Sequence, residues 1–157
     1  MEKKERNFLV AVDESKESMF ALYWCITKLI PHTTNVKLVL LYVQPTPAFH
    51  SFIASGCAFY NDVILDMDKY CIDLVDSVME RAGDICKKLN TTDIKIERII
   101  GRGDAKDVIC NAVKKFEADT LVMGTHSYGF FKRALVGSVS DYCAMYAKCP
   151  VVIVKHP

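Results

Sequence analysis

Phe8-Leu-Val-Ala-Val12, with Asp13 directly behind it, is the stretch of the chain that decides the fold. Every residue of this run is apolar, without the alternation that marks a strand with one wet face. Continuous apolar strands are buried on both faces, as in parallel sheets that are covered by helices. We therefore expect this run to lie inside a parallel sheet. Four further runs are short and apolar enough to be strands: 36–43, 94–100, 120–123 and 151–154.

Amphipathic segments separate these runs. From 62 to 89, apolar residues recur every three or four positions, which is the period of a helix that packs one face on a core. Another helix is expected from Ser15, its cap, to Pro31, which should stop it. The remaining two should start at Gly103-Asp104, with Val108, Ala112 and Phe116 facing inward, and near Ser138, ending before Cys149-Pro150.

The alternation of strands and helices predicts a doubly wound α/β fold, because right-handed crossovers place helices on both faces of the sheet. The run at 94–100 carries Lys95, Glu97 and Arg98 among its apolar residues, which is typical of an edge strand. We expect a Rossmann-like, five-stranded parallel open sheet in the order 3-2-1-4-5. Residues 1–157 should form one domain, in which the aperiodic stretch 44–61 is a long flexible loop.

Composition excludes several classes of protein. The 20 Lys and Arg against 19 Asp and Glu give a net charge of +1, which speaks against a dedicated nucleic-acid surface. No apolar stretch approaches the roughly 20 residues of a membrane span, and no secretory signal is recognisable, so we expect a cytoplasmic protein. The 7 Cys include no C-x-x-C pair and the 4 His are scattered, so no metal site is expected.

The candidate site lies where two strands end. Doubly wound sheets bind ligands beyond the carboxyl ends of their strands, at the point where the strand order reverses. With the first strand central, this point falls between Asp13 and Gly124. A carboxylate at a strand end is suited to accept hydrogen bonds from ribose hydroxyls. The alternative is that Asp13 only caps the first helix.

The second half of the site is the segment 124–140, which leaves a strand and enters a helix. Its glycines Gly124, Gly129 and Gly137 let backbone N–H groups turn toward an anion, and a helix that starts at Ser138 adds further donors. The segment therefore predicts a phosphate cradle, with a long connection that needs glycines only for its turns as the alternative. The chain contains neither G-x-x-x-x-G-K-[ST] nor G-x-S-x-G.

These residues resemble the universal stress protein family, in its small single-domain plant-type members. The family pattern is Gly, two residues, Gly, nine residues, Gly and then Ser or Thr. Here Gly124 fills the first place, nine residues run from Tyr128 to Val136, and Gly137-Ser138 closes the pattern. The resemblance covers nearly the whole chain, through Val10-Ala-Val-Asp13, Leu41-Tyr-Val43, Gly103-Asp-Ala-Lys-Asp-Val-Ile109, Gly137-Ser-Val-Ser140 and Cys149-Pro-Val-Val-Ile-Val154.

The resemblance implies an adenine-nucleotide-binding protein, with ATP or AMP as the bound ligand and Mg²⁺ accompanying ATP. It also implies a homodimer joined through the last strand, 151–154. Asp13 would contact the ribose. The residues implied around the base, ribose and phosphates are Ala11, Val12, Asp13, Val43, Met123, Gly124, Thr125, His126, Ser127, Gly137, Ser138, Val139 and Ser140.

One position departs from the family pattern, since Ser127 stands where the second glycine belongs. If this position needs φ > 0, serine costs roughly 1 kcal/mol there, although its hydroxyl can offer a hydrogen bond to a phosphate. The adenosine end of the site is therefore better supported than the triphosphate end.

Three functions fit this sequence. The first is a stress-linked adenine-nucleotide-binding sensor or regulator. The second is a slow ATP hydrolase, in which Lys132 and Arg133 would stabilise phosphate charge. The third is a nucleotide-free scaffold or chaperone-like dimer, which Ser127 and the aromatic residues of 44–61 favour.

Overall fold

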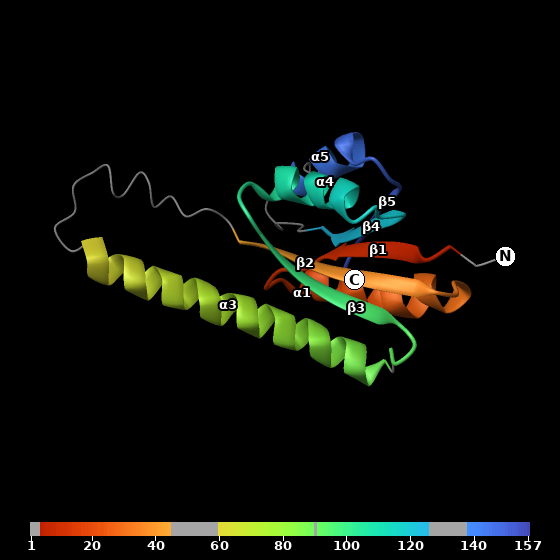
Figure 1. Ribbon diagram of the computed structural model, residues 1–157, viewed down its shortest axis with the longest axis horizontal. Helices are drawn as coiled ribbons and strands as arrows, with labels where there is room; N and C mark the ends of the chain where they lie inside the picture. The colour runs from red at the N-terminus through yellow and green to blue at the C-terminus, as the bar shows by residue number, and fades with distance from the viewer. Residues whose placement is uncertain (1–3, 45–59, 90, 126–137) are drawn as a thin grey trace.

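The computed structural model describes residues 4–44, 60–89, 91–125 and 138–157, with residues 60–71 described by their backbone. Strands and helices alternate along these ranges as the sequence pattern predicts (Figure 1). The elements in chain order are β1 (Arg6–Ala11), α1 (Lys16–Trp24), η1 (Cys25–Leu29), η2 (Ile30–His32), β2 (Val36–Gln44), α3 (Tyr60–Lys88), β3 (Lys95–Arg102), α4 (Ala105–Lys115), β4 (Thr120–Gly124), α5 (Ser138–Tyr146) and β5 (Val151–Val154). Most of the predicted 44–61 loop, residues 45–59, lies outside the described residues.

The five strands form one parallel sheet in the order β3-β2-β1-β4-β5, which confirms the predicted fold class and strand order. β1 lies in the middle, where it pairs with β2 on one side and with β4 on the other. β3, the run with the interspersed charges, lies at the edge as expected. The carboxyl ends of β1 and β4 are therefore neighbours, since Val10 pairs with Val122.

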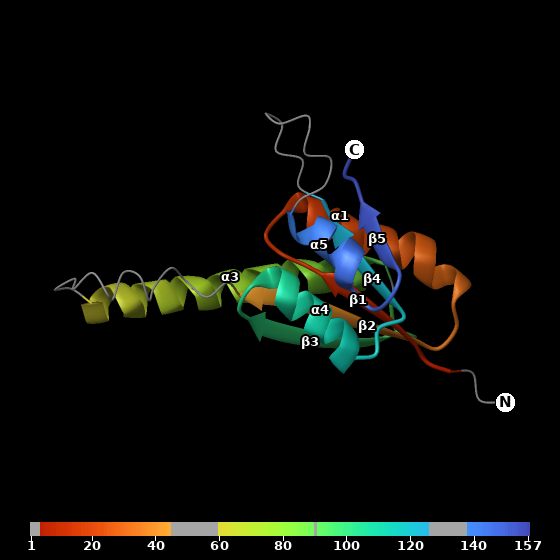
Figure 2. The same cartoon turned by 90° about the horizontal axis from the view of Figure 1, so that it is seen from above.

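Helices cover both faces of the sheet (Figure 1). Alternate residues of β1 serve opposite faces: Val10 packs with α1 and α3, whereas Leu9 packs with α4 and α5, and neither is exposed. α3 is much longer than the strands, and its amino-terminal half extends past the sheet in both views (Figures 1 and 2). Within the described ranges, no helix is long and apolar enough to cross a membrane.

Two helices differ in detail from their sequence predictions. Pro31 does not stop the first helix: α1 passes through a π-turn at η1 into a short 3-10 turn that includes Pro31. Proline is tolerated there because it lies in the first turn of η2. The N–H groups of a first turn have no carbonyl partner within their own helix, so the missing N–H of proline costs little. In α4 the buried face is Ile109, Ala112 and Val113, while the predicted Val108 and Phe116 are only half-buried.

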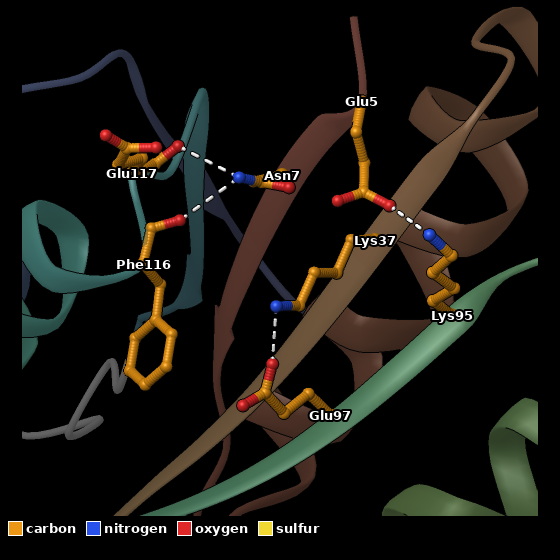
Figure 3. Close-up of polar contacts among 7 residues, drawn as sticks. All are labelled: Glu5, Asn7, Lys37, Lys95, Glu97, Phe116 and Glu117. Carbon is orange, nitrogen blue, oxygen red and sulfur yellow. Dashed lines mark hydrogen bonds and ion pairs between the residues drawn. The ribbon is translucent and has the colours of Figure 1, made fainter.

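Polar contacts fix the amino ends of the strands, at the end of the sheet away from the candidate site (Figure 3). The Asn7 side-chain amide donates to the carbonyls of Phe116 and Glu117 at 3.1 and 3.3 Å, and its backbone N–H donates to Asp119 at 2.9 Å. This contact holds the start of β1 against the segment that joins α4 to β4. Lys37 pairs with Glu97 at 2.6 Å, across β2 and β3.

Candidate functional site

The turn between β1 and α1 holds Asp13 in a network of short-range hydrogen bonds. Its Oδ1 accepts a hydrogen bond from the backbone N–H of Ser15 at 2.9 Å and a second from the Ser15 hydroxyl. Ser15 is the cap of α1, because its Oγ accepts from the backbone N–H of Ser18 at 3.1 Å. Asp13 thus supports the capping residue and is not itself the cap.

Ser18 is a residue of this turn that the sequence prediction missed. Its side chain is 5% exposed, and its hydroxyl accepts from the Asp13 N–H at 2.9 Å and donates to the Asp13 carbonyl at 3.1 Å. Both backbone groups of Asp13 are therefore held from within the helix that follows. The sequence signal that could have identified Ser18 is its place three residues after the cap Ser15. In a capping box, these two positions exchange hydrogen bonds between side chain and backbone.

Gly124 brings the end of β4 against this same turn. A Cβ atom built on Gly124 would lie 2.5 Å from the Glu17 carbonyl oxygen and 2.8 Å from the Ser18 backbone nitrogen. Only glycine leaves room for that approach. The sequence prediction assigned this glycine to an anion-binding turn, and the structure gives it a packing role as well, in the close approach of β4 to α1. The approach also places the end of β4 beside Asp13.

An apolar wall lies on the α4 and α5 side of the two strand ends. Ala11, Val43 and Val139 are half-buried and Met123 is 5% exposed, and all four pack in one apolar cluster. The resemblance implied Ala11 and Val43 around a base, and Met123 and Val139 along the ribose and phosphates; in the structure all four belong to this one cluster. Half-buried apolar side chains at the carboxyl ends of parallel strands offer a flat aromatic ligand a surface to pack on.

Val12, also predicted near the base, differs from these four. Its side chain is 3% exposed and packs in the core on the opposite face of the sheet, with α1. Its backbone N–H donates to the carbonyl of Leu41 at 2.9 Å, which continues the pairing of β1 with β2. Val12 can therefore meet a ligand on the α4 and α5 side only through its backbone.

Three of the remaining predicted residues are described, one just after β4 and two in the first turn of α5. Thr125 is buried, and its N–H donates to the Val154 carbonyl at 3.3 Å, which carries the β4–β5 pairing one residue further. α5 begins at Ser138, an exposed residue, and Ser140 in its first turn is buried. Asp141 adds a negative charge to that turn, which sequence reasoning did not weigh. His126, Ser127 and Gly137 lie outside the described residues.

The described ranges contain no group of three or more His, Cys, Asp or Glu side chains arranged to hold a metal ion. At the carboxyl ends of the strands these ranges offer the Asp13 carboxylate, an apolar wall and the start of α5, which carries Asp141. Such a site suits a ligand with an aromatic part, a hydroxylated part and an anionic end.

Comparison with known proteins gives a consistent result. The model of the universal stress protein family matches residues 5–155. A universal stress protein A-like protein of Arabidopsis thaliana is 29% identical over 155 aligned positions, covering 87% of this chain and 77% of that protein. Universal stress protein PHOS32 of the same plant is 28% identical, and the match covers 97% of this chain and 65% of that protein.

A solved structure shares both the fold and a detectable sequence likeness. It is the crystal structure of an Arabidopsis thaliana protein of this family with AMP bound. It superposes with a TM-score of 0.67 at 25% identity, covering 97% of this chain and 92% of that chain.

Proposed function

The chain belongs to the universal stress protein family, and from this premise we propose that it is a stress-linked protein that binds an adenine nucleotide where β1, β4 and α5 meet. One observation carries the proposal: Gly124 packs on the backbone of Glu17 and Ser18. This contact places the end of β4 beside the β1–α1 turn, which contains Asp13. The similar Arabidopsis protein with AMP bound supports the choice of ligand.

Each part of the nucleotide has a proposed counterpart. The adenine packs on the wall of Ala11, Val43, Met123 and Val139. Asp13 accepts hydrogen bonds from the ribose hydroxyls, and the backbone of Val12 borders the base. The phosphate end lies at the start of α5, where N–H groups and the helix dipole favour an anion. The residues proposed for that end are Gly124, Thr125, His126, Ser127, Gly137, Ser138 and Ser140.

We propose a role as a sensor or regulator that responds to nucleotide levels. AMP is the minimal ligand for this site, since it contains the adenine, the ribose and one phosphate. ATP with Mg²⁺ would extend past the start of α5. Asp141, in the first turn of that helix, repels additional negative charge, so we expect AMP to bind at least as tightly as metal-free ATP.

Calorimetric titration of the purified chain tests this proposal. We expect saturable, one-to-one binding of AMP, and much weaker binding of GMP, because the exocyclic groups of guanine differ at the apolar wall. GMP is the matched control, since it keeps the ribose and the phosphate. Equal affinity for the two nucleotides would contradict the assigned base site, and the absence of heat with AMP and ATP would contradict the function.

We also propose a homodimer joined along β5. β5 lies at an edge of the sheet, and its residues Val151, Val152 and Ile153 are only half-buried. The neighbouring end of α5 leaves Met145 75% exposed and Tyr146 55% exposed, which is unusual for large apolar side chains.

Sedimentation at micromolar concentration should give the mass of two chains. Replacing the exposed Met145 by Lys should shift the equilibrium toward the monomer, because a charge would be buried at the contact. Ile72→Lys, on the exposed face of α3, is the matched control and should leave the dimer intact. A wild-type chain that sediments as a monomer would refute the interface.

A further inference from the structure

Two cysteine thiols meet between the helices that cover one face of the sheet. The Sγ of Cys110, on α4, lies 4.0 Å from the Sγ of Cys143, on α5, and both are free thiols. Cys143 has no exposed surface, whereas Cys110 is half-buried and reaches the solvent. The 7 Cys of the sequence include no C-x-x-C pair that would have indicated this contact, so it is a finding of the structure.

We propose that Cys110 and Cys143 are a redox modification site that forms a reversible disulfide between α4 and α5. A disulfide requires sulfur atoms about 2.0 Å apart and Cβ atoms about 3.8 Å apart. The two thiols already face one another across a helix–helix contact, so a change of side-chain rotamer and a small shift of the helices close the remaining gap. The proposal does not depend on nucleotide binding.

The oxidant is hydrogen peroxide, and the two thiols have different tasks. The Cys110 sulfur attacks the peroxide, the O–O bond breaks, and Cys110 becomes a sulfenic acid while one water leaves. The Cys143 sulfur then attacks the Cys110 sulfur and the S–O bond breaks. The departing hydroxide takes the Cys143 proton and leaves as the second water. In total, two thiols lose two electrons and two protons, and one peroxide becomes two waters.

The difference in burial between the two thiols indicates which one reacts first with the oxidant. Burial raises the pKa of the Cys143 thiol to about 12, so this residue stays protonated and does not react first with an oxidant from solution. Cys110 is the partner that solvent reaches. The thiols Cys25 and Cys86, on the other face of the sheet, are both buried, and burial raises the pKa of Cys25 to about 12 as well. Neither of these two thiols offers peroxide an exposed sulfur.

Cys149 is the natural internal control for this pair. It is half-buried like Cys110 and packs in the same apolar cluster, and burial also raises its pKa. No sulfur contact of the kind that joins Cys110 to Cys143 is found for it within the described ranges. The structure therefore makes a selective prediction, in which two thiols of this cluster are linked and the third stays free.

The test uses the full chain with Cys57 and Cys71 replaced by Ser, since the side chains of these two residues lie outside the described part of the structure. The protein is treated with hydrogen peroxide, alkylated under denaturing conditions, digested and mapped by mass spectrometry. We expect one intramolecular peptide pair that joins Cys110 to Cys143 and disappears on reduction with dithiothreitol. Cys149→Ser should preserve the pair, whereas Cys110→Ser should abolish it.

Thermal unfolding supplies an independent measurement. The disulfide closes a loop between positions 33 residues apart, so the oxidised protein should melt roughly 5–10 °C above the reduced protein. The same mapping on the wild-type chain covers the case in which the double Ser variant does not fold. Full alkylation of Cys110 and Cys143 after peroxide treatment, or a bond from either one to Cys149, overturns the proposal.

Discussion

Gly124→Ala is expected to lower the free energy of unfolding by about 3 kcal/mol, and with it the Tm by roughly 10 °C. The added methyl group would lie 2.5 Å from the Glu17 carbonyl oxygen and 2.6 Å from its carbon. Both atoms belong to the backbone of the first turn of α1, so no side chain can rotate away to make room. Either β4 or α1 must move, and both are packed against buried core residues. Chemical denaturation followed by circular dichroism measures the loss.

Gly83→Ala is the matched control, because it also places a methyl group close to another atom. There the nearest atom is Nη2 of Arg98 at 2.8 Å, the far end of a flexible and exposed side chain. Arg98 can move, and alanine favours the interior of α3 over glycine by about 1 kcal/mol. We expect Gly83→Ala to be neutral or stabilising. An equal loss in both variants would show that the backbone approach at Gly124 is not the cause.

Asp13→Ala is expected to weaken AMP binding about 10- to 100-fold, because hydrogen bonds to a charged carboxylate contribute about 1.5–3 kcal/mol. This residue is placed for the task by its own surroundings: Ser15 donates to its carboxylate and Ser18 holds its backbone. The carboxylate therefore needs little reorganisation when ribose arrives. Titration of the variant with AMP measures the loss, and a folded variant with wild-type affinity would remove Asp13 from the site.

Two controls separate contact with the ribose from support of the helix cap. Ser15→Ala removes the cap and keeps the carboxylate, so it should cost about 1 kcal/mol of stability and change AMP affinity only slightly. The second control titrates wild type and Asp13→Ala with AMP and with 2′,3′-dideoxy-AMP. If Asp13 binds the hydroxyls, their removal weakens binding to the wild type but not to the variant. An equal loss in both proteins would contradict the assignment.

The interior place of β1 and the edge place of β3 could be predicted because these two strands carry their own signals. The unbroken apolarity of Phe8 to Val12 marks a strand covered on both sides, and the charges at Lys95 and Glu97 mark an edge. Helix starts were equally local, since Ser15 and Asp104 are polar residues that accept hydrogen bonds from the turn that follows. These features require only neighbours in sequence, and therefore a single sequence reveals them.

What could not be predicted depends on contacts between distant segments. The need for glycine at 124 arises from α1, more than a hundred residues earlier in the chain. Val12 lies on the α1 side of the sheet because side chains alternate between the two faces along β1, and this assignment requires both faces to be covered first. The buried face of α4 is set by its packing on the sheet and on α5. The meeting of Cys110 and Cys143 likewise requires two helices to be placed first.

The central position of β1 has a consequence for how the chain is made. Of the five strands β1 is the first to be synthesised, yet one of its two edges is completed by β4, through pairs such as Phe8 with Thr120. Until that later segment has been synthesised, the edge of β1 that pairs with β4 has no partner strand. Nascent chains in this condition are prone to stick to one another. Slower translation between the codons for β2 and β4 should therefore reduce the yield of native protein more than slower translation after β5.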